Sequence, residues 1–139
     1  MIARLARIGG RVLLAALFIL AGIAKVLDGA PFLAHMAEHG VPGLLLPAVI
    51  VLEIGAGIAV LLGWRLMISA GALGVFCLLT ALLFHTNLGD HVERTMFFKD
   101  IAIGGGLFVL AATRRRATRI EDTILAWAPP GLGLRREVP

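Results

Sequence analysis

Long stretches without charge constrain this 139-residue chain more than any other feature of its sequence. No charged residue occurs between Leu66 and Phe84, and Glu53 is the only one between Val41 and Trp64. A helix needs about 20 residues, each adding about 1.5 Å, to cross the roughly 30 Å hydrocarbon core of a bilayer. Both blocks are long enough, and we expect each to be a membrane-spanning helix.

Two shorter apolar blocks flank this central region. Val12–Ala24 and Ile101–Thr113 each contain 13 uncharged residues, which amounts to only about 20 Å of helix. Each can cross a bilayer only if its helix carries nearby charges into or near the membrane, Lys25 in the first block and Lys99 and Asp100 in the last. The sequence therefore predicts four spans, at about residues 8–27, 43–64, 65–86 and 96–113.

The composition agrees with this interpretation. Hydrophobic residues make up 59% of the chain before its 17 glycines are counted, whereas soluble domains reach about 45–50% with glycine included. Only 16% of the residues are charged, so a soluble globule and a disordered chain are both excluded. The net charge of +4 does not indicate nucleic-acid binding, because the basic residues lie at the ends of apolar blocks and form no stripe with interleaved aromatics.

The arginines predict which way the helices run. With four spans, ten of the eleven arginines fall on one side of the membrane and only Arg94 falls on the other. Because basic residues are enriched in cytoplasmic segments, we expect both termini and the tail over residues 114–139 in the cytoplasm. The predicted fold class is all-α: a single-domain, four-helix transmembrane bundle over residues 1–139. A cleaved signal peptide at the N-terminus is the alternative, but it would put the two basic ends on opposite sides.

Two further helices are expected outside the spans. Between spans one and two, on the outer side, Pro31 and Gly40 bracket a short helix at Pro31–His39. Past the last span, Thr118 and Glu121 have the spacing of a capping box. They predict a separate tail helix along the inner membrane interface.

Five ionisable side chains lie in the spans on the outer side of the membrane. Lys25, His85, Lys99 and Asp100 all lie at the outer ends of their spans, and Glu53 lies about two turns deeper. A charge at mid-bilayer costs about 2.5–3.5 kcal/mol on insertion scales, so such groups usually face the bundle interior and pair. We therefore expect these five residues to form one polar cluster near the outer leaflet. Lys99 and Asp100 are neighbours about 100° apart on a helix, so one of the two should turn outward.

Small residues on the same helix faces support an inward orientation for the lysines. Lys25 shares a face with Gly22, and Lys99 shares one with Ala102 and Gly106. Because small residues mark helix–helix contacts in membranes, we expect both faces to pack against neighbouring helices.

The cluster has two interpretations. In the first it is only a clasp of paired charges between helices. In the second it is a site for a proton or a polar head group, and Glu53, as the deepest group, is its leading residue. The single cysteine, Cys77, rules out an intramolecular disulfide and dithiol chemistry, and we expect it to pack in the core.

Histidines on the outer side raise the question of a metal. His35 and His39 lie four residues apart on the short helix, and the second outer loop, Thr86–Thr95, adds Asp90, His91 and Glu93. Such a set can bind zinc. Histidines in loops are more often simply solvated, so no metal site is predicted.

At these residues the sequence resembles the DoxX family. The resemblance covers about residues 11–112 and rests on the segments FILAGIAKVLD (18–28), HGVP (39–42), LEIGAGIAVLLG (52–63), FH (84–85) and FFKDIAIGGGL (97–107). It implies a small bacterial inner-membrane protein with four helices. Some members are subunits of membrane oxidoreductases, including ones that pass electrons to quinone. The matching polar positions are Lys25, Glu53, His85 and Lys99, whereas position 100 is Asp where the family pattern suggests Asn.

We therefore expect an accessory or quinone-interacting subunit of a membrane redox system. The sequence contains no ligand pattern for haem, flavin or an iron–sulfur cluster, so no covalent cofactor is expected and quinone is the expected ligand. Expected partners are the lipid bilayer, a redox subunit or a second copy of the chain. The alternatives are a small proton-coupled transporter and a non-catalytic membrane assembly protein.

Overall fold

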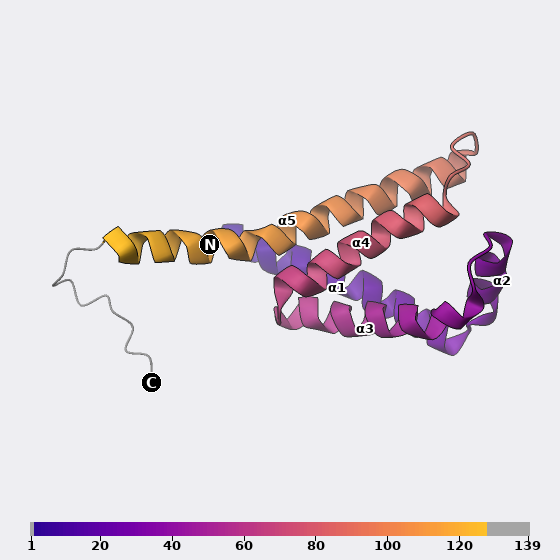
Figure 1. Cartoon of the computed structure of the whole chain (residues 1–139), viewed down its shortest axis with the longest axis horizontal. Helices are drawn as coiled ribbons and strands as arrows, with labels where there is room; N and C mark the ends of the chain where they lie inside the picture. The colour runs from indigo at the N-terminus through magenta and orange to yellow at the C-terminus, as the bar shows by residue number, and fades with distance from the viewer. Residues whose placement is uncertain (1, 128–139) are drawn as a thin grey trace.

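Helices account for the regular structure in the part of the chain that the structure, a computed structural model, describes (Figure 1). This part is the backbone of residues 2–127, with side chains for residue 2 and residues 5–113. The elements in chain order are α1 (Ile2–Leu27), α2 (Ala30–Glu38), the 3-10 turn η1 (Gly43–Leu45), α3 (Leu46–Leu62), α4 (Leu66–Phe84) and α5 (His91–Trp127).

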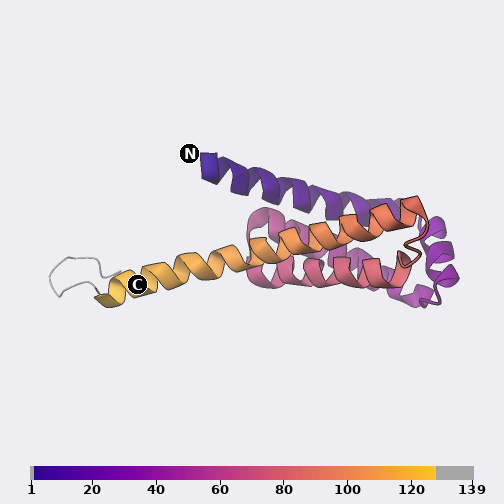
Figure 2. The same ribbon diagram turned by 90° about the horizontal axis from the view of Figure 1, so that it is seen from above.

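Four segments of these helices are long and apolar enough to cross a membrane. They are Leu5–Leu27, Gly43–Leu62, Leu66–Phe84 and His91–Thr113. The all-α, four-span fold class predicted from the sequence is confirmed. The beginning of α1 and the end of α5 lie at one end of the bundle, and α2 lies at the other, which we call the α2 end (Figures 1 and 2).

The last candidate span ends at Thr113 as predicted, but its helix begins earlier and ends later than expected. Helix α5 begins at His91 because the Asp90 carboxylate accepts hydrogen bonds from the backbone N–H groups of Val92 and Glu93, at 2.8 and 3.0 Å. The helix then continues to Trp127, so the separate tail helix expected at Thr118 is wrong. No proline lies in this range to interrupt the backbone hydrogen bonds. The side chains that were expected at the inner interface lie outside the described residues.

The short helix between the first two spans is confirmed. Helix α2 covers Ala30–Glu38, has Pro31 in its first turn, and is followed by Gly40 at a φ of 68°. A positive φ costs little conformational energy only for glycine. The chain therefore turns at Gly40 and returns into η1 and α3.

The spans pack as two pairs. Helix α1 lies along α3 and α4 lies along α5, and the two pairs diverge toward the α2 end (Figure 1). The buried hydrophobic core is concentrated where the pairs meet, and Cys77 belongs to it. Its members are Ala15, Phe18, Val60, Leu66, Ala70, Leu73, Cys77, Leu107 and Ala111.

Glycines allow the helices to come close together within each pair. A Cβ on Gly57 of α3 would lie 2.9 Å from Ile19 Cγ1 of α1, and one on Gly104 of α5 would lie 3.1 Å from the backbone oxygen of Gly74 in α4. Only a residue without a side chain allows helices to approach this closely.

One predicted packing face is wrong. Ala102 is exposed, and nothing lies within 4 Å of a Cβ built on Gly106. Helix α5 instead turns Gly104, Leu107 and Ala111 inward. Because glycine is generally frequent in membrane-spanning helices, small residues at helical spacing do not by themselves decide which face packs.

Candidate functional site at the α2 end

Lys25 and Glu53 form a closed ion pair between α1 and α3. The Lys25 Nζ donates to Oε1 of Glu53 at 2.9 Å and to Oε2 at 2.8 Å. The Glu53 side chain is only 4% exposed. The Lys25 ammonium also lies 4.8 Å from the centre of the Phe32 ring in α2, a favourable cation–π distance. Both carboxylate oxygens of Glu53 are therefore occupied by one partner.

Gly22 makes this pairing feasible. It lies one turn before Lys25, and a Cβ on Gly22 would lie 3.4 Å from Glu53 Cβ and 2.6 Å from Ile54 Cγ1. The missing side chain lets α3 approach α1 directly beside the ion pair. The predicted face shared by Gly22 and Lys25 is thus a true helix contact.

His85 forms a second polar group between α4 and α5. It lies just past the end of α4, and its Nδ1 is 2.9 Å from Oε2 of Glu93. Its Nε2 lies 3.9 Å from Oδ2 of Asp100, which is too long for a direct hydrogen bond. The ring is 16% exposed. Glu93 and Asp100 are seven residues apart, two helical turns, and so reach His85 from the same face of α5.

The Glu93 contact favours one tautomer of His85. Beside an ionised carboxylate, which can only accept hydrogen bonds, Nδ1 carries the hydrogen. In the neutral ring, Nε2 then holds the lone pair. His85 therefore presents an oriented nitrogen that can accept a proton or, once protonated, donate one.

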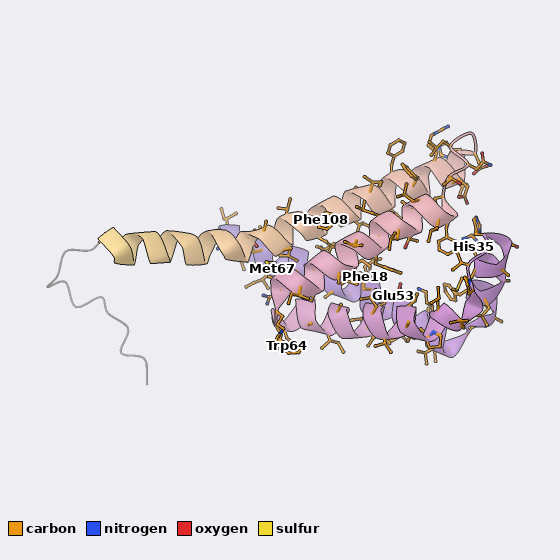
Figure 3. All side chains as sticks on the ribbon, in the orientation of Figure 1. Phe18, His35, Glu53, Trp64, Met67 and Phe108 are labelled. Atoms are coloured by element: carbon orange, nitrogen blue, oxygen red, sulfur yellow. The ribbon has the colours of Figure 1, made fainter. Side chains whose placement is uncertain are left out.

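Helix α2 covers the end of α4 with aromatic rings. The His35 ring stacks on Phe84 at a centroid distance of 5.2 Å and an interplanar angle of 22°, and the His39 ring meets Phe84 edge-on, also at 5.2 Å. The centroids of His35 and His85 are 6.3 Å apart. Figure 3 shows His35 on the side of α2 that faces α4. Aromatic rings thus border His85.

The structure divides the five predicted site residues. Lys25 pairs with Glu53, and His85 lies beside Asp100. Lys99 is exposed, and its Nζ lies 2.9 Å from Sδ of Met96 on the same helix. Among the side chains that the structure describes, no hydrogen bond or ion pair joins the Lys25–Glu53 pair to His85. Since α5 turns Asp100 toward His85, the 100° rotation to its neighbour turns Lys99 away.

Glu93 was considered from the sequence only as a possible metal ligand and was not placed beside His85. It was assigned to the loop Thr86–Thr95, because the last span was expected to begin near Met96. Asp90, a favourable residue for capping a helix start, was the available signal. A helix beginning at His91 places Glu93 on the face of Asp100.

A third group lies on α2 itself. His35, Glu38 and His39 each offer a ligand atom, and these atoms all lie within 4.8 Å of one another. Two of the three loop residues first considered with these histidines have other partners in the structure: Asp90 caps α5, and Glu93 binds His85.

Comparisons with known proteins identify the family of this chain. The DoxX family model matches residues 6–86, which include Lys25, Glu53 and His85. The chain is 42% identical over 111 residues to the inner membrane protein YqjF of Escherichia coli K12, an alignment that covers 80% of this chain and 85% of that protein. No solved structure matches the chain. Because it has four helices that can span a membrane and a relative in the inner membrane, the chain is a multi-pass protein of the bacterial inner membrane. It belongs to the DoxX family.

Proposed function

We propose that this protein is a quinone-interacting subunit of a membrane redox system, in which His85 binds the quinone head group. The observation that carries the proposal is the pairing of His85 with Glu93. The carboxylate orients the ring through Nδ1 and leaves Nε2 without a direct hydrogen bond. This is the arrangement that a group needs in order to pass a proton to and from a ligand.

The chemistry of a quinone matches this site. A quinone head group is a flat ring whose carbonyl oxygens accept hydrogen bonds, and its reduction takes up two electrons and two protons. A protonated Nε2 of His85 can donate to such an oxygen, while Glu93 stabilises the imidazolium that carries the proton. Asp100, 3.9 Å from Nε2, is a carboxyl group nearby that can take up a proton and pass it on as the second one. The electrons would come from a partner subunit.

The surroundings of His85 suit an amphiphilic ligand. His85 directly follows a 19-residue apolar helix. The end of such a helix lies at the depth where lipid head groups meet the hydrocarbon core. Phe84 and His35 provide flat aromatic surface at this position. Leu83 and Phe98 are exposed on the two helices of the pair and offer apolar surface for an isoprenoid tail.

The Lys25–Glu53 pair has a different role in this proposal. Both Glu53 oxygens are engaged by Lys25, so the pair fits a clasp between α1 and α3. A proton-coupled transporter that used Glu53 would have to break this pair in every cycle. The geometry therefore favours His85, and not Glu53, as the group that handles protons.

The test uses the full chain purified in mild detergent from bacterial membranes. Bound lipids are extracted and quinone is quantified in the wild type, His85→Gln and His91→Gln. His91 lies in the first turn of α5 and is exposed, so its variant is the matched control. We expect quinone to co-purify with the wild type and with His91→Gln, and to be lost from His85→Gln.

A titration with a short-chain ubiquinone analogue covers the case in which detergent strips the native lipid. Saturable binding that weakens at least about tenfold in His85→Gln supports the proposal, this being the size expected for losing one charge-assisted hydrogen bond. Equal binding by all three proteins, or none by any, overturns it. Proton uptake into liposomes that depends on Glu53 would instead support the transporter.

A further inference from the structure

We propose that His35, Glu38 and His39 form a binding site for a divalent transition-metal ion of the zinc type at the α2 end. The three side chains come from one helical turn, and their ligand atoms lie within 4.8 Å of one another. Glu38 and His39 lie three and four residues after His35, so each is beside it on the helix surface, and the separation of the ligand atoms lets a single ion reach all three.

Two nitrogens and one oxygen define the class of ion. Imidazole with carboxylate suits zinc and similar transition metals, whereas calcium and magnesium prefer ligands that are all oxygen. A set of two histidines and one glutamate also leaves a coordination position open for water or another ligand.

The hydrogen bond of His39 prepares its ring for this role. Its Nδ1 lies 2.9 Å from the backbone oxygen of His35. A carbonyl oxygen only accepts, so Nδ1 carries the hydrogen, and the lone pair of the neutral ring is on Nε2. Metal-binding histidines are commonly oriented by such a contact through the other nitrogen.

His35 is held by its neighbours. Its ring stacks on Phe84 at 5.2 Å and meets the His39 ring edge-on at 4.5 Å. Both histidine rings are therefore ordered before any ion binds, which lowers the entropy lost on binding.

Glu38 is the adjustable ligand. One of its oxygens, Oε2, lies 3.7 Å from Nδ1 of His35, and its side chain is 72% exposed. Two atoms bound to one zinc ion at about 2.1 Å each can be no more than about 4.2 Å apart. The 3.7 Å separation of Glu38 Oε2 from His35 Nδ1 already meets this limit, and the exposed carboxylate can rotate as an ion binds.

An ion at this site would stabilise α2. A helix of nine residues is too short to be stable alone in water, and an ion that links successive turns favours the helical state. Because His35 rests on Phe84, the residue before His85, the ordered α2 would also border the proposed quinone site. The metal site does not depend on quinone binding.

The test is a calorimetric titration of the full chain with ZnCl2, using protein without a polyhistidine tag. We expect one zinc ion per chain. His39→Ala and Glu38→Gln should each weaken binding by at least about tenfold, since even indirect partners of a metal contribute about 10–100-fold. His91→Ala, an exposed histidine outside the group, should bind zinc like the wild type.

Hydrogen exchange at the α2 amides gives a second measurement. Zinc should slow this exchange in the wild type and leave it unchanged in His39→Ala. His85→Gln should keep its zinc affinity, so that loss of quinone binding and loss of zinc binding can be told apart. Absence of saturable binding overturns the metal site, as does binding that survives in His39→Ala or depends on His85 or His91.

Discussion

The Nζ atom of Lys25 lies 2.9 and 2.8 Å from the two carboxylate oxygens of Glu53, so a single ion pair joins the last turn of α1 to α3. The glutamate is almost fully buried. Each charge lies in a segment long and apolar enough to span the membrane. Neither could remain in that position alone, because an unpaired charge there is costly. The pair therefore fixes how the two helices align.

We expect Glu53→Gln to destabilise the protein strongly. The substitution leaves the Lys25 ammonium partly buried with no opposing charge, and removing one partner of a buried pair costs about 3–5 kcal/mol. Thermal unfolding in detergent, followed by circular dichroism, measures the loss as a lower melting temperature.

Two further variants separate charge from packing. The double variant Lys25→Met with Glu53→Leu removes both charges, so it should melt closer to the wild type than Glu53→Gln does. Asp28→Asn, at an exposed position, is the control for loss of a carboxylate. A Glu53→Gln protein that melts with the wild type would show that the pair contributes nothing.

Glu93→Gln should release the orientation of His85 while leaving the fold intact. A glutamine amide can accept or donate a hydrogen bond, so Nδ1 of His85 is no longer required to carry the hydrogen. The 15N chemical shifts of the His85 ring should move toward a mixture of tautomers, and quinone affinity should fall by about tenfold or less.

A purely structural role for Glu93 would lower the melting temperature without this spectroscopic change. In either case the loss of stability in Glu93→Gln should be below about 1 kcal/mol, because Glu93 is partly exposed and exposed ion pairs contribute little. Unchanged ring shifts in Glu93→Gln would contradict the role assigned to this carboxylate.

The sequence predicts the spans well because hydrocarbon imposes one requirement along the whole chain. In a span such as Leu66–Phe84, a helix that satisfies its own backbone hydrogen bonds is the only structure that lipid allows at this length. The ends of helices outside the hydrocarbon core depend on weaker interactions, such as capping hydrogen bonds. Asp90 moved the start of α5 by capping it at His91, and the expected cap at Thr118 had no effect inside a continuous helix.

The site was less predictable because it depends on rotation about each helix axis. Periodicity places Lys99 with Ala102 and Gly106 but does not say whether that face points to lipid or protein. The contact of Gly104 with α4 decides the rotation of α5, and it turns Asp100 toward His85. Sequence spacing alone predicts neither the rotation of α5 nor the contact between Asp100 and His85.

Gly104→Val should therefore destabilise the α4–α5 pair, whereas Gly105→Val should not. A Cβ at position 104 would lie 3.1 Å from the backbone oxygen of Gly74, and nothing lies within 4 Å of one at position 105. The two variants have the same intrinsic helix propensity, so their difference measures packing alone. We expect a difference of about 1–3 kcal/mol, the usual cost of overpacking, measured by thermal unfolding in the same detergent. Equal melting temperatures would mean that α5 is rotated differently about its axis.

The arginine distribution alone predicts which end of the bundle faces the cytoplasm. If the arginine-rich end is cytoplasmic, the loop after α4 faces the periplasm and the turn between α3 and α4 faces the cytoplasm. Gly89 and Trp64 lie in these two segments, and Trp64 is exposed. In a Cys77→Ala background, which removes the single native thiol, each position receives one cysteine.

A membrane-impermeant maleimide should label Gly89→Cys in cells with a permeabilised outer membrane. It should label Trp64→Cys only after the inner membrane is also opened. The reverse pattern would place α2 and its histidines in the cytoplasm, and labelling of both positions from the outside would contradict the four-span arrangement. The predicted pattern puts His35, Glu38 and His39 in the periplasm, where an ion from the medium reaches them without crossing the inner membrane.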